Sequence, residues 1–100
     1  MNHGQYQQGD VTLERVDRLP SGAKKASHRI LARGETTGHA HRLEEATDGL
    51  LYEATDGTLY VRVGPKEATI AHEEHRPITL PPGDYRVGRV QEYDHFAEEA

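Results

Sequence analysis

The sequence predicts an all-β fold, a small single-domain barrel or sandwich of about eight short strands. Short runs alternate between apolar and polar residues, and turn signals rich in Gly, Pro or Asp-Gly recur about every eight to twelve residues. No segment keeps an apolar period of 3.6 residues, so no long amphipathic helix is expected. The chain has 100 residues, which is room for one domain covering residues 1–100.

The first strands are predicted from alternation that starts after a Gly-Asp pair. Residues 11–16 alternate apolar and polar positions, the period of a half-buried strand. Residues 19–25 contain Pro and Gly and predict a loop. Residues 28–33 alternate again and predict a second strand, with a turn or two of helix over 24–32 as the alternative. Glycines bracket a turn at 34–38, which leads into a histidine-bearing strand.

The middle of the chain contains a short internal echo. The four letters Ala-Thr-Asp-Gly open both residues 46–53 and residues 54–61. Asp-Gly favours the positive φ values of two-residue hairpin turns, so the echo predicts two successive chain reversals. The segment 59–63 is the clearest strand in the sequence because its β-branched, aromatic and aliphatic residues follow one of these turns.

The last strands are expected at 68–72, 78–80 and 85–90, each bounded by Pro, Gly or charged residues. A short flexible segment is expected at the N-terminus, over about residues 1–8, because its residues are nearly all polar. The acidic C-terminal tail, over about residues 94–100, is expected to fray.

The composition excludes several classes of protein. The formal net charge is -5, from 12 basic and 17 acidic residues, which argues against a nucleic-acid partner. Cysteine is absent, so disulfides, thiolate metal sites and thiol nucleophiles are excluded. No apolar run approaches the roughly 20 residues that span a bilayer, and the first residues do not resemble a signal peptide. A cytoplasmic protein without a membrane partner is therefore expected.

The small apolar content predicts a narrow margin of stability. Hydrophobic residues make up 34% of the chain, and short domains bury a smaller share of their surface than long ones. A bound metal ion or a homo-oligomer interface would supply additional stability. The sequence has no G-x-S-x-G elbow and no glycine-rich nucleotide motif, so a serine triad or a nucleotide site is not expected.

The most distinctive residues are the histidines. His39 and His41 are two residues apart, so on a strand both side chains point to one face. Glu45 lies four residues after His41 and keeps the same parity if the strand stays regular. Imidazole and carboxylate groups on one face are ligands of divalent metal ions. A histidine pair on a solvated strand face is the simpler alternative.

A second pair of histidines follows at His72 and His75. His72 is in phase with Ile70 and would point inward. His75 is three residues later, so it joins the same site only if the chain turns at Glu73 and Glu74. The segment is one residue too short for the HExxH helix of metalloproteases. The alternative is a polar turn whose charges face water.

These motifs resemble the cupin superfamily. The matching residues of its first motif are Gly34, His39, His41 and Glu45, and the segment 81–84 resembles the turn before the last strands of its second motif. The resemblance covers the chain from Gly34 to about His95. It implies a double-stranded β-helix in which two histidines, a glutamate and one later histidine bind Fe, Mn, Ni, Zn or another divalent ion.

By this resemblance His39, His41 and Glu45 are ligands. The fourth ligand is His72, or His95 if the alignment is extended. Reasoning from spacing alone adds His75 as a further candidate.

Two functions from different classes follow. The first is a metalloprotein that takes a small-molecule substrate, with Glu73 or Glu74 as acid or base and the reaction left open. The second is a non-enzymatic binding or homo-oligomeric assembly module whose histidines form a polar or pH-sensitive interface. Metal content and oligomeric state discriminate between them.

Overall fold

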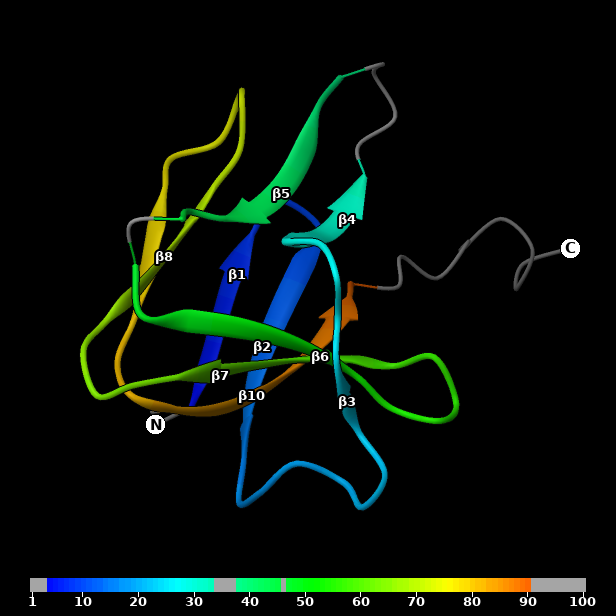
Figure 1. The fold of residues 1–100 in the computed structure, drawn as a ribbon. Helices are drawn as coiled ribbons and strands as arrows, with labels where there is room; N and C mark the ends of the chain where they lie inside the picture. Colours follow the sequence, from blue (N-terminus) through cyan, green and yellow to red (C-terminus); the bar gives the residue numbers. More distant parts are fainter. Residues whose placement is uncertain (1–3, 34–37, 46, 91–100) are drawn as a thin grey trace, which may run out of the picture.

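The computed structural model describes residues 4–33, 38–45 and 47–90. These residues form ten β-strands and no helix, so the predicted all-β class is confirmed and the strand number exceeds the expected eight (Figure 1). No helix among them is long and apolar enough to cross a membrane. The strands are β1 (Gln5–Gln8), β2 (Val11–Val16), β3 (Lys24–Lys25), β4 (Ile30–Arg33), β5 (Ala40–Leu43), β6 (Gly49–Glu53), β7 (Leu59–Val63), β8 (Ala68–Ala71), β9 (Ile78–Leu80) and β10 (Gly83–Arg89).

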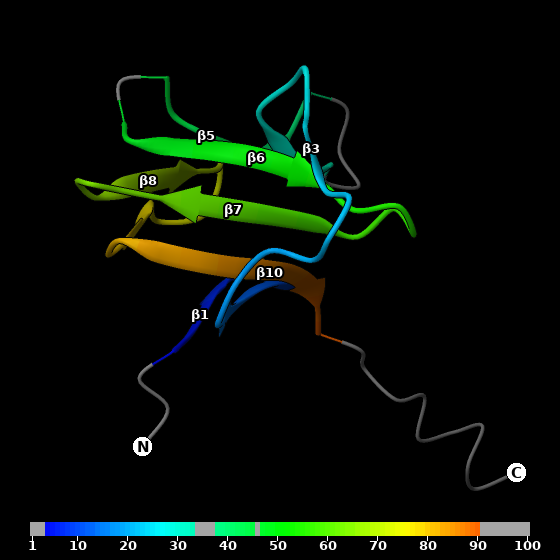
Figure 2. The same cartoon turned by 60° about the horizontal axis from the view of Figure 1, so that its bottom comes forward.

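The strands form two antiparallel sheets. The larger has the order β1-β2-β10-β7-β6-β3, and the smaller has the order β4-β5-β8-β9. Figure 2 shows β6, β7 and β10 side by side in the larger sheet. Within the described residues, β1, β3, β4 and β9 each pair on one side only, whereas a closed barrel needs every strand paired on both sides. The predicted closed barrel is therefore wrong, because alternation fixes which face of a strand is buried but not which strand it pairs with.

The apolar core lies between the sheets. Both sheets contribute, and its buried members are Val11, Leu13, Leu31, Leu43, Leu51, Val61, Val63, Ala68, Ile70, Leu80 and Tyr85. Tyr85 is completely buried, and its hydroxyl donates a hydrogen bond to the carbonyl of Pro81 at 2.7 Å. Its ring packs edge-on against Tyr6 with centroids 5.9 Å apart. Burying each large apolar side chain of this kind stabilises the fold by about 1.5–3 kcal/mol.

Residues 5–8 form a strand where the sequence predicts a flexible segment. Gln5–Gln8 forms β1, which pairs with β2 through the two-residue turn Gly9-Asp10. Gly9 has a φ of 60°, as the first position of a type II′ hairpin turn requires. Of these four strand residues, the half-buried Tyr6 packs against the apolar core, and Gln8 is the buried one. A buried glutamine breaks the apolar pattern, so sequence alternation does not detect this strand.

One of the two predicted Asp-Gly reversals is a hairpin. Asp56-Gly57 lies in the turn between β6 and β7, where Ala54 N–H donates to Thr58 O at 2.8 Å. Gly49 instead begins β6, and a Cβ there would lie 2.9 Å from the Cβ of Ala68. The expected acidic tail over 94–100 falls outside the described residues.

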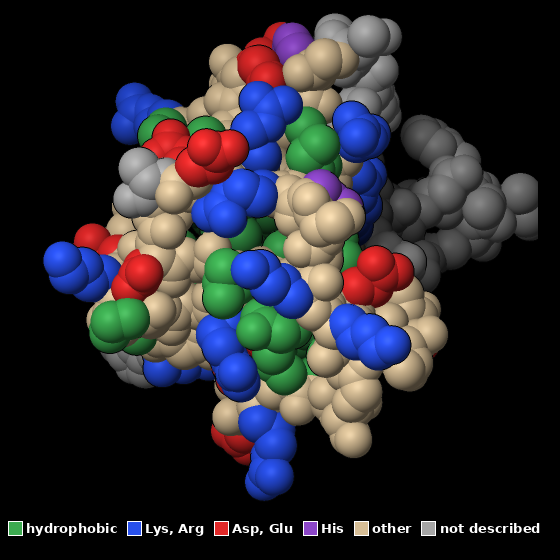
Figure 3. Space-filling model, in the orientation of Figure 1, with side chains coloured by type: hydrophobic (Ala, Val, Ile, Leu, Met, Phe, Trp, Pro, Cys, Tyr) green, Lys and Arg blue, Asp and Glu red, His purple; other side chains and the backbone are tan. Residues whose placement is uncertain are grey.

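The outer surface of the larger sheet is polar. Figure 3 shows lysine and arginine side chains surrounding small apolar areas on one face of the molecule. Cross-strand pairing places Lys25 beside Tyr52, and Leu50 beside Arg62, whose guanidinium binds Asp84 at 2.9 Å. The cation Arg62 is therefore neutralised by its own sheet.

Candidate functional site

Four imidazole rings lie together at one end of the sandwich. His39 and His41 come from β5 and the residue just before it, and His72 and His75 come from the bend after β8. Ring centroids are 4.4 Å apart for His41–His72, 4.6 Å for His72–His75, 5.8 Å for His39–His72 and 5.9 Å for His41–His75. We call these four residues the imidazole cluster. The two histidine pairs recognised in the sequence thus meet in space.

Strand pairing explains why they meet. β5 and β8 are antiparallel, and Arg42 pairs with Ala71, so His41 and His72 are next along the ladder. The chain then bends over residues 73–75. The spacing in the sequence requires such a bend if His72 and His75 are to share one site. The bend brings the His75 ring beside the His72 ring.

Glu73 holds the bend against β5. Its carboxylate accepts the Ala40 N–H at 2.9 Å and an Arg42 guanidinium N–H at 2.9 Å. The Ala40 N–H bond is the main reason why the pKa of Glu73 falls to about 2, and Arg42 adds to it. Glu74 stays more exposed, with its carboxylate 3.7 Å from His39 Nδ1.

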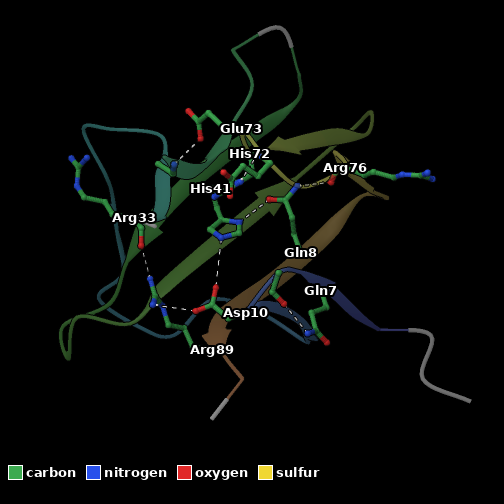
Figure 4. A network of polar contacts seen from close by, with 12 residues as sticks. Gln7, Gln8, Asp10, Arg33, His41, His72, Glu73, Arg76 and Arg89 are labelled. Atoms are coloured by element: carbon green, nitrogen blue, oxygen red, sulfur yellow. Dashed lines mark hydrogen bonds and ion pairs between the residues drawn. The ribbon is translucent and has the colours of Figure 1, made fainter. Parts of the chain in front are cut away.

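His41 is the buried member of the cluster and is bound by Gln8 of β1 (Figure 4). The side-chain nitrogen of Gln8 donates to the carbonyls of Ile70 at 3.0 Å and Arg76 at 2.8 Å. Carbonyls only accept, so the amide oxygen of Gln8 must face His41 Nδ1, 2.8 Å away. Nδ1 of the neutral ring therefore carries the proton, and the lone pair is on Nε2.

Asp10 faces that lone pair from the β1–β2 turn. Its Oδ1 lies 3.7 Å from His41 Nε2, and its Oδ2 lies 3.3 Å from Arg89 Nη1. Arg89 also donates to the carbonyl of Arg33 at 3.0 Å, which fixes the guanidinium at the rim (Figure 4). Arg89 and Asp10 come from the larger sheet and His41 from the smaller one, so the site lies where the two sheets meet.

His75 fits into the cluster because residue 9 is glycine. A Cβ at Gly9 would lie 2.6 Å from His75 Nε2, closer than real side chains approach. The ring of His75 is nearly parallel to that of His41, at an interplanar angle of 13°. Gly9 thus serves both the turn geometry and the close approach of an imidazole.

Burial controls the charge of His41. Desolvation lowers the pKa of His41, repulsion from His72 lowers it further, and the carboxylate of Asp10 opposes both. The ring is therefore neutral at pH 7 and its Nε2 lone pair is available to a ligand.

The donor set suits a transition-metal ion, although the rings are not yet arranged around one. No group of three or more His, Asp or Glu side chains in the described part of the chain is placed to hold a metal ion as it stands. Imidazoles that share one ion at 2.0–2.1 Å have ring centroids about 5 Å apart. The observed distances of 4.4 to 5.9 Å bracket this value. His72 Nδ1 accepts the Glu74 N–H at 3.0 Å, so this ring must rotate to become a ligand.

Glu45 does not join the cluster. β5 ends at Leu43, and Glu45 is exposed in the turn that follows. The predicted parity with His41 depends on a strand that continues, and the strand stops first. Gly34 and His95 lie outside the described residues.

Gln8 and Asp10 are the site residues that sequence reasoning missed. The signal for them is the Gly9-Asp10 pair after Gln8, a two-residue turn that places both side chains beside the second sheet. Neither residue carries a recognisable motif.

A family described as a domain of unknown function (DUF8820) matches residues 7–90. The chain belongs to this family. The matched region contains the whole imidazole cluster, together with Gln8 and Asp10. No curated protein and no solved structure matches the chain. The cupin resemblance therefore stays a prediction.

Proposed function

We propose that this domain binds one divalent transition-metal ion at the imidazole cluster. The observation that carries the proposal is the state of His41, whose ring is buried while its Nδ1–H is donated to Gln8. A histidine that ligates through one nitrogen commonly donates the other to a fixed acceptor. The arrangement therefore supports His41 Nε2 as the anchoring ligand.

The other three imidazoles supply the remaining nitrogens. His39, His72 and His75 are more exposed than His41, so their rings can rotate toward a shared ion without repacking the core. Imidazole ligands suit Zn, Fe or Ni better than they suit Mn, Mg or Ca, which prefer oxygen.

A bound divalent ion would supply Lewis-acid polarisation to a small-molecule substrate. Glu73 and Glu74 are the two candidates for proton transfer. Glu73 is occupied by Ala40 N–H and Arg42, and a pKa of about 2 makes it a poor proton carrier at neutral pH. Glu74, beside His39 and largely exposed, is the better acid or base. The reaction itself is left open.

Metal titration of untagged, chelator-treated protein tests the proposal. We expect one zinc or nickel ion per chain by calorimetry and elemental analysis, with binding lost in His41→Ala and His72→Gln. His28→Gln is the matched control, because His28 is exposed and lies outside the cluster. Absence of stoichiometric binding in the wild type, or equal loss in the control, would contradict the proposal.

The assembly hypothesis stays a prediction alongside this one, as do the cytoplasmic location and the cupin-like β-helix. A homo-oligomer with histidines at its interface would change mass between pH 5.5 and 8, which light scattering measures. A His39→Ala variant with altered mass and unaltered metal content would favour assembly over metal binding.

A further inference from the structure

We infer that Asp10 supplies the carboxylate ligand of this site, with the ion lying between its Oδ1 and His41 Nε2. The inference rests on the proposed metal binding and assigns the oxygen ligand that the sequence places at Glu45. It gives the site a mixed nitrogen and oxygen donor set drawn from both sheets.

The first argument is the orientation of the His41 ring. Its Nδ1 edge is held by the side-chain oxygen of Gln8, so Nε2 is the nitrogen turned toward Asp10 Oδ1. Their separation of 3.7 Å is longer than the roughly 2.7–3.2 Å of a hydrogen bond. A metal ion shared by the nitrogen and the carboxylate oxygen would bridge two atoms that do not contact each other directly.

The second argument is distance. A zinc-type ion sits about 2.1 Å from an imidazole nitrogen and from a carboxylate oxygen. With both bonds at that length, the separation of 3.7 Å corresponds to an N–metal–O angle of about 120°, close to the tetrahedral range. The separation of these two atoms is therefore already compatible with a shared ion.

The third argument is that Asp10 is held in place by groups that leave Oδ1 free. The Asp10 carbonyl accepts the Val90 N–H at 2.8 Å, which fixes the backbone of the turn. Arg89 binds the other carboxylate oxygen, Oδ2, at 3.3 Å. Both side chains of this pair are about half exposed, so their attraction contributes little stability. Arg89 therefore acts as a positioning residue that orients the carboxylate.

The same turn admits a second imidazole. His75 lies over Gly9, directly before Asp10, and its ring is stacked 5.9 Å from that of His41. Asp10, His41 and His75 thus form one wall of the site. The exposed His75 can join the ligands, together with the other imidazoles of the cluster, after a change of side-chain rotamer.

The decisive experiment compares Asp10→Asn with Asp56→Asn. Both changes remove one carboxylate charge at a hairpin turn, and Asp56 serves only its own turn by accepting Thr58 N–H at 2.9 Å. We expect Asp10→Asn to weaken zinc binding by at least about tenfold in a chelator competition, and Asp56→Asn to leave it unchanged. Visible absorption of the cobalt-loaded protein should shift only in Asp10→Asn, since an amide oxygen is a weaker ligand.

Two further variants keep the result interpretable if Asp10→Asn folds poorly. Asp10→Glu retains a carboxylate and should recover part of the affinity. Arg89→Gln should weaken binding by a smaller factor, without changing the cobalt spectrum in kind. Wild-type protein that binds zinc while Asp10→Asn binds equally well overturns this inference and leaves the proposed function standing. Wild-type protein that does not bind zinc overturns both.

Discussion

Tyr85 in the apolar core and His41 in the imidazole cluster are both buried, but their polar atoms are satisfied differently. Each brings a polar atom between the sheets, and Tyr85 satisfies its single hydroxyl proton with the Pro81 carbonyl. His41 satisfies Nδ1 with Gln8 and leaves Nε2 facing Asp10 at 3.7 Å. The hydroxyl of Tyr85 is satisfied inside the core, whereas His41 Nε2 faces a carboxylate at a distance too long for a hydrogen bond.

The largest effect is expected in the core. Leu13→Ala removes a fully buried side chain and should lower the free energy of unfolding by about 2–5 kcal/mol. Leu50→Ala, on the exposed outer face of β6, should change it by less than about 0.5 kcal/mol. Chemical denaturation of both variants measures the contrast. Equal effects would mean that the sheets do not pack as described.

Removing the Gln8 side chain should lower the free energy of unfolding more than removing the Tyr85 hydroxyl does. Gln8→Ala leaves His41 Nδ1 and the Ile70 carbonyl without their partners, for a loss of about 1–3 kcal/mol. Tyr85→Phe removes a single hydrogen bond, for a loss of about 1 kcal/mol. If denaturation reverses this order, Gln8 does not join the two sheets as the structure indicates.

Low pH and high pH should each destabilise the metal-free protein, through residues in different regions. The lowered pKa of His41 means that the unfolded chain binds its proton more tightly, so stability falls as pH drops below about 6.5. Burial raises the pKa of Tyr85, so the unfolded chain ionises first and stability falls as pH rises above about 10. Denaturant midpoints across this range check both limbs. The acid limb should shrink in His41→Gln and the alkaline limb in Tyr85→Phe.

The smallest effect concerns the bend over the cluster. Glu73→Gln weakens the contacts to Ala40 N–H and Arg42 and should lower zinc affinity a few-fold, with little change in unfolding. Glu74→Gln, in the same bend, keeps those contacts and serves as the control. A greater loss of affinity in Glu74→Gln would show that Glu74 is a ligand and that Glu73 does not hold the bend.

The parts of the fold that follow local alternation could be predicted from the sequence. The strands at 11–16 and 59–63 have their expected bounds, because alternating side chains there meet an apolar core on one face. β1 was not expected, because its inward residue Gln8 is polar and is satisfied only by carbonyls of the opposite sheet. A polar residue can be buried at this position only because the opposite sheet supplies those hydrogen-bond acceptors.

The same distinction applies to the site. The spacing of His39 and His41 predicts that they share one face, and a bend is the condition for His72 and His75 to share one site. The meeting of the two pairs depends on the pairing of β5 with β8, which spacing does not encode. The nearness of Asp10 to His41 is not predictable in this way. Asp10 reaches His41 through the packing of one sheet on the other, a non-local relation that spacing does not encode.

The placement of the imidazole cluster at the junction of the sheets has a consequence for the life of the molecule. Its donors come from three distant stretches of chain, so no unfolded or clipped chain presents them together. Occupancy by an ion at 100 times its dissociation constant would then stabilise the native state by about 2.7 kcal/mol. If the proposed ion binds, the domain should therefore resist proteolysis longer in its presence than after chelation.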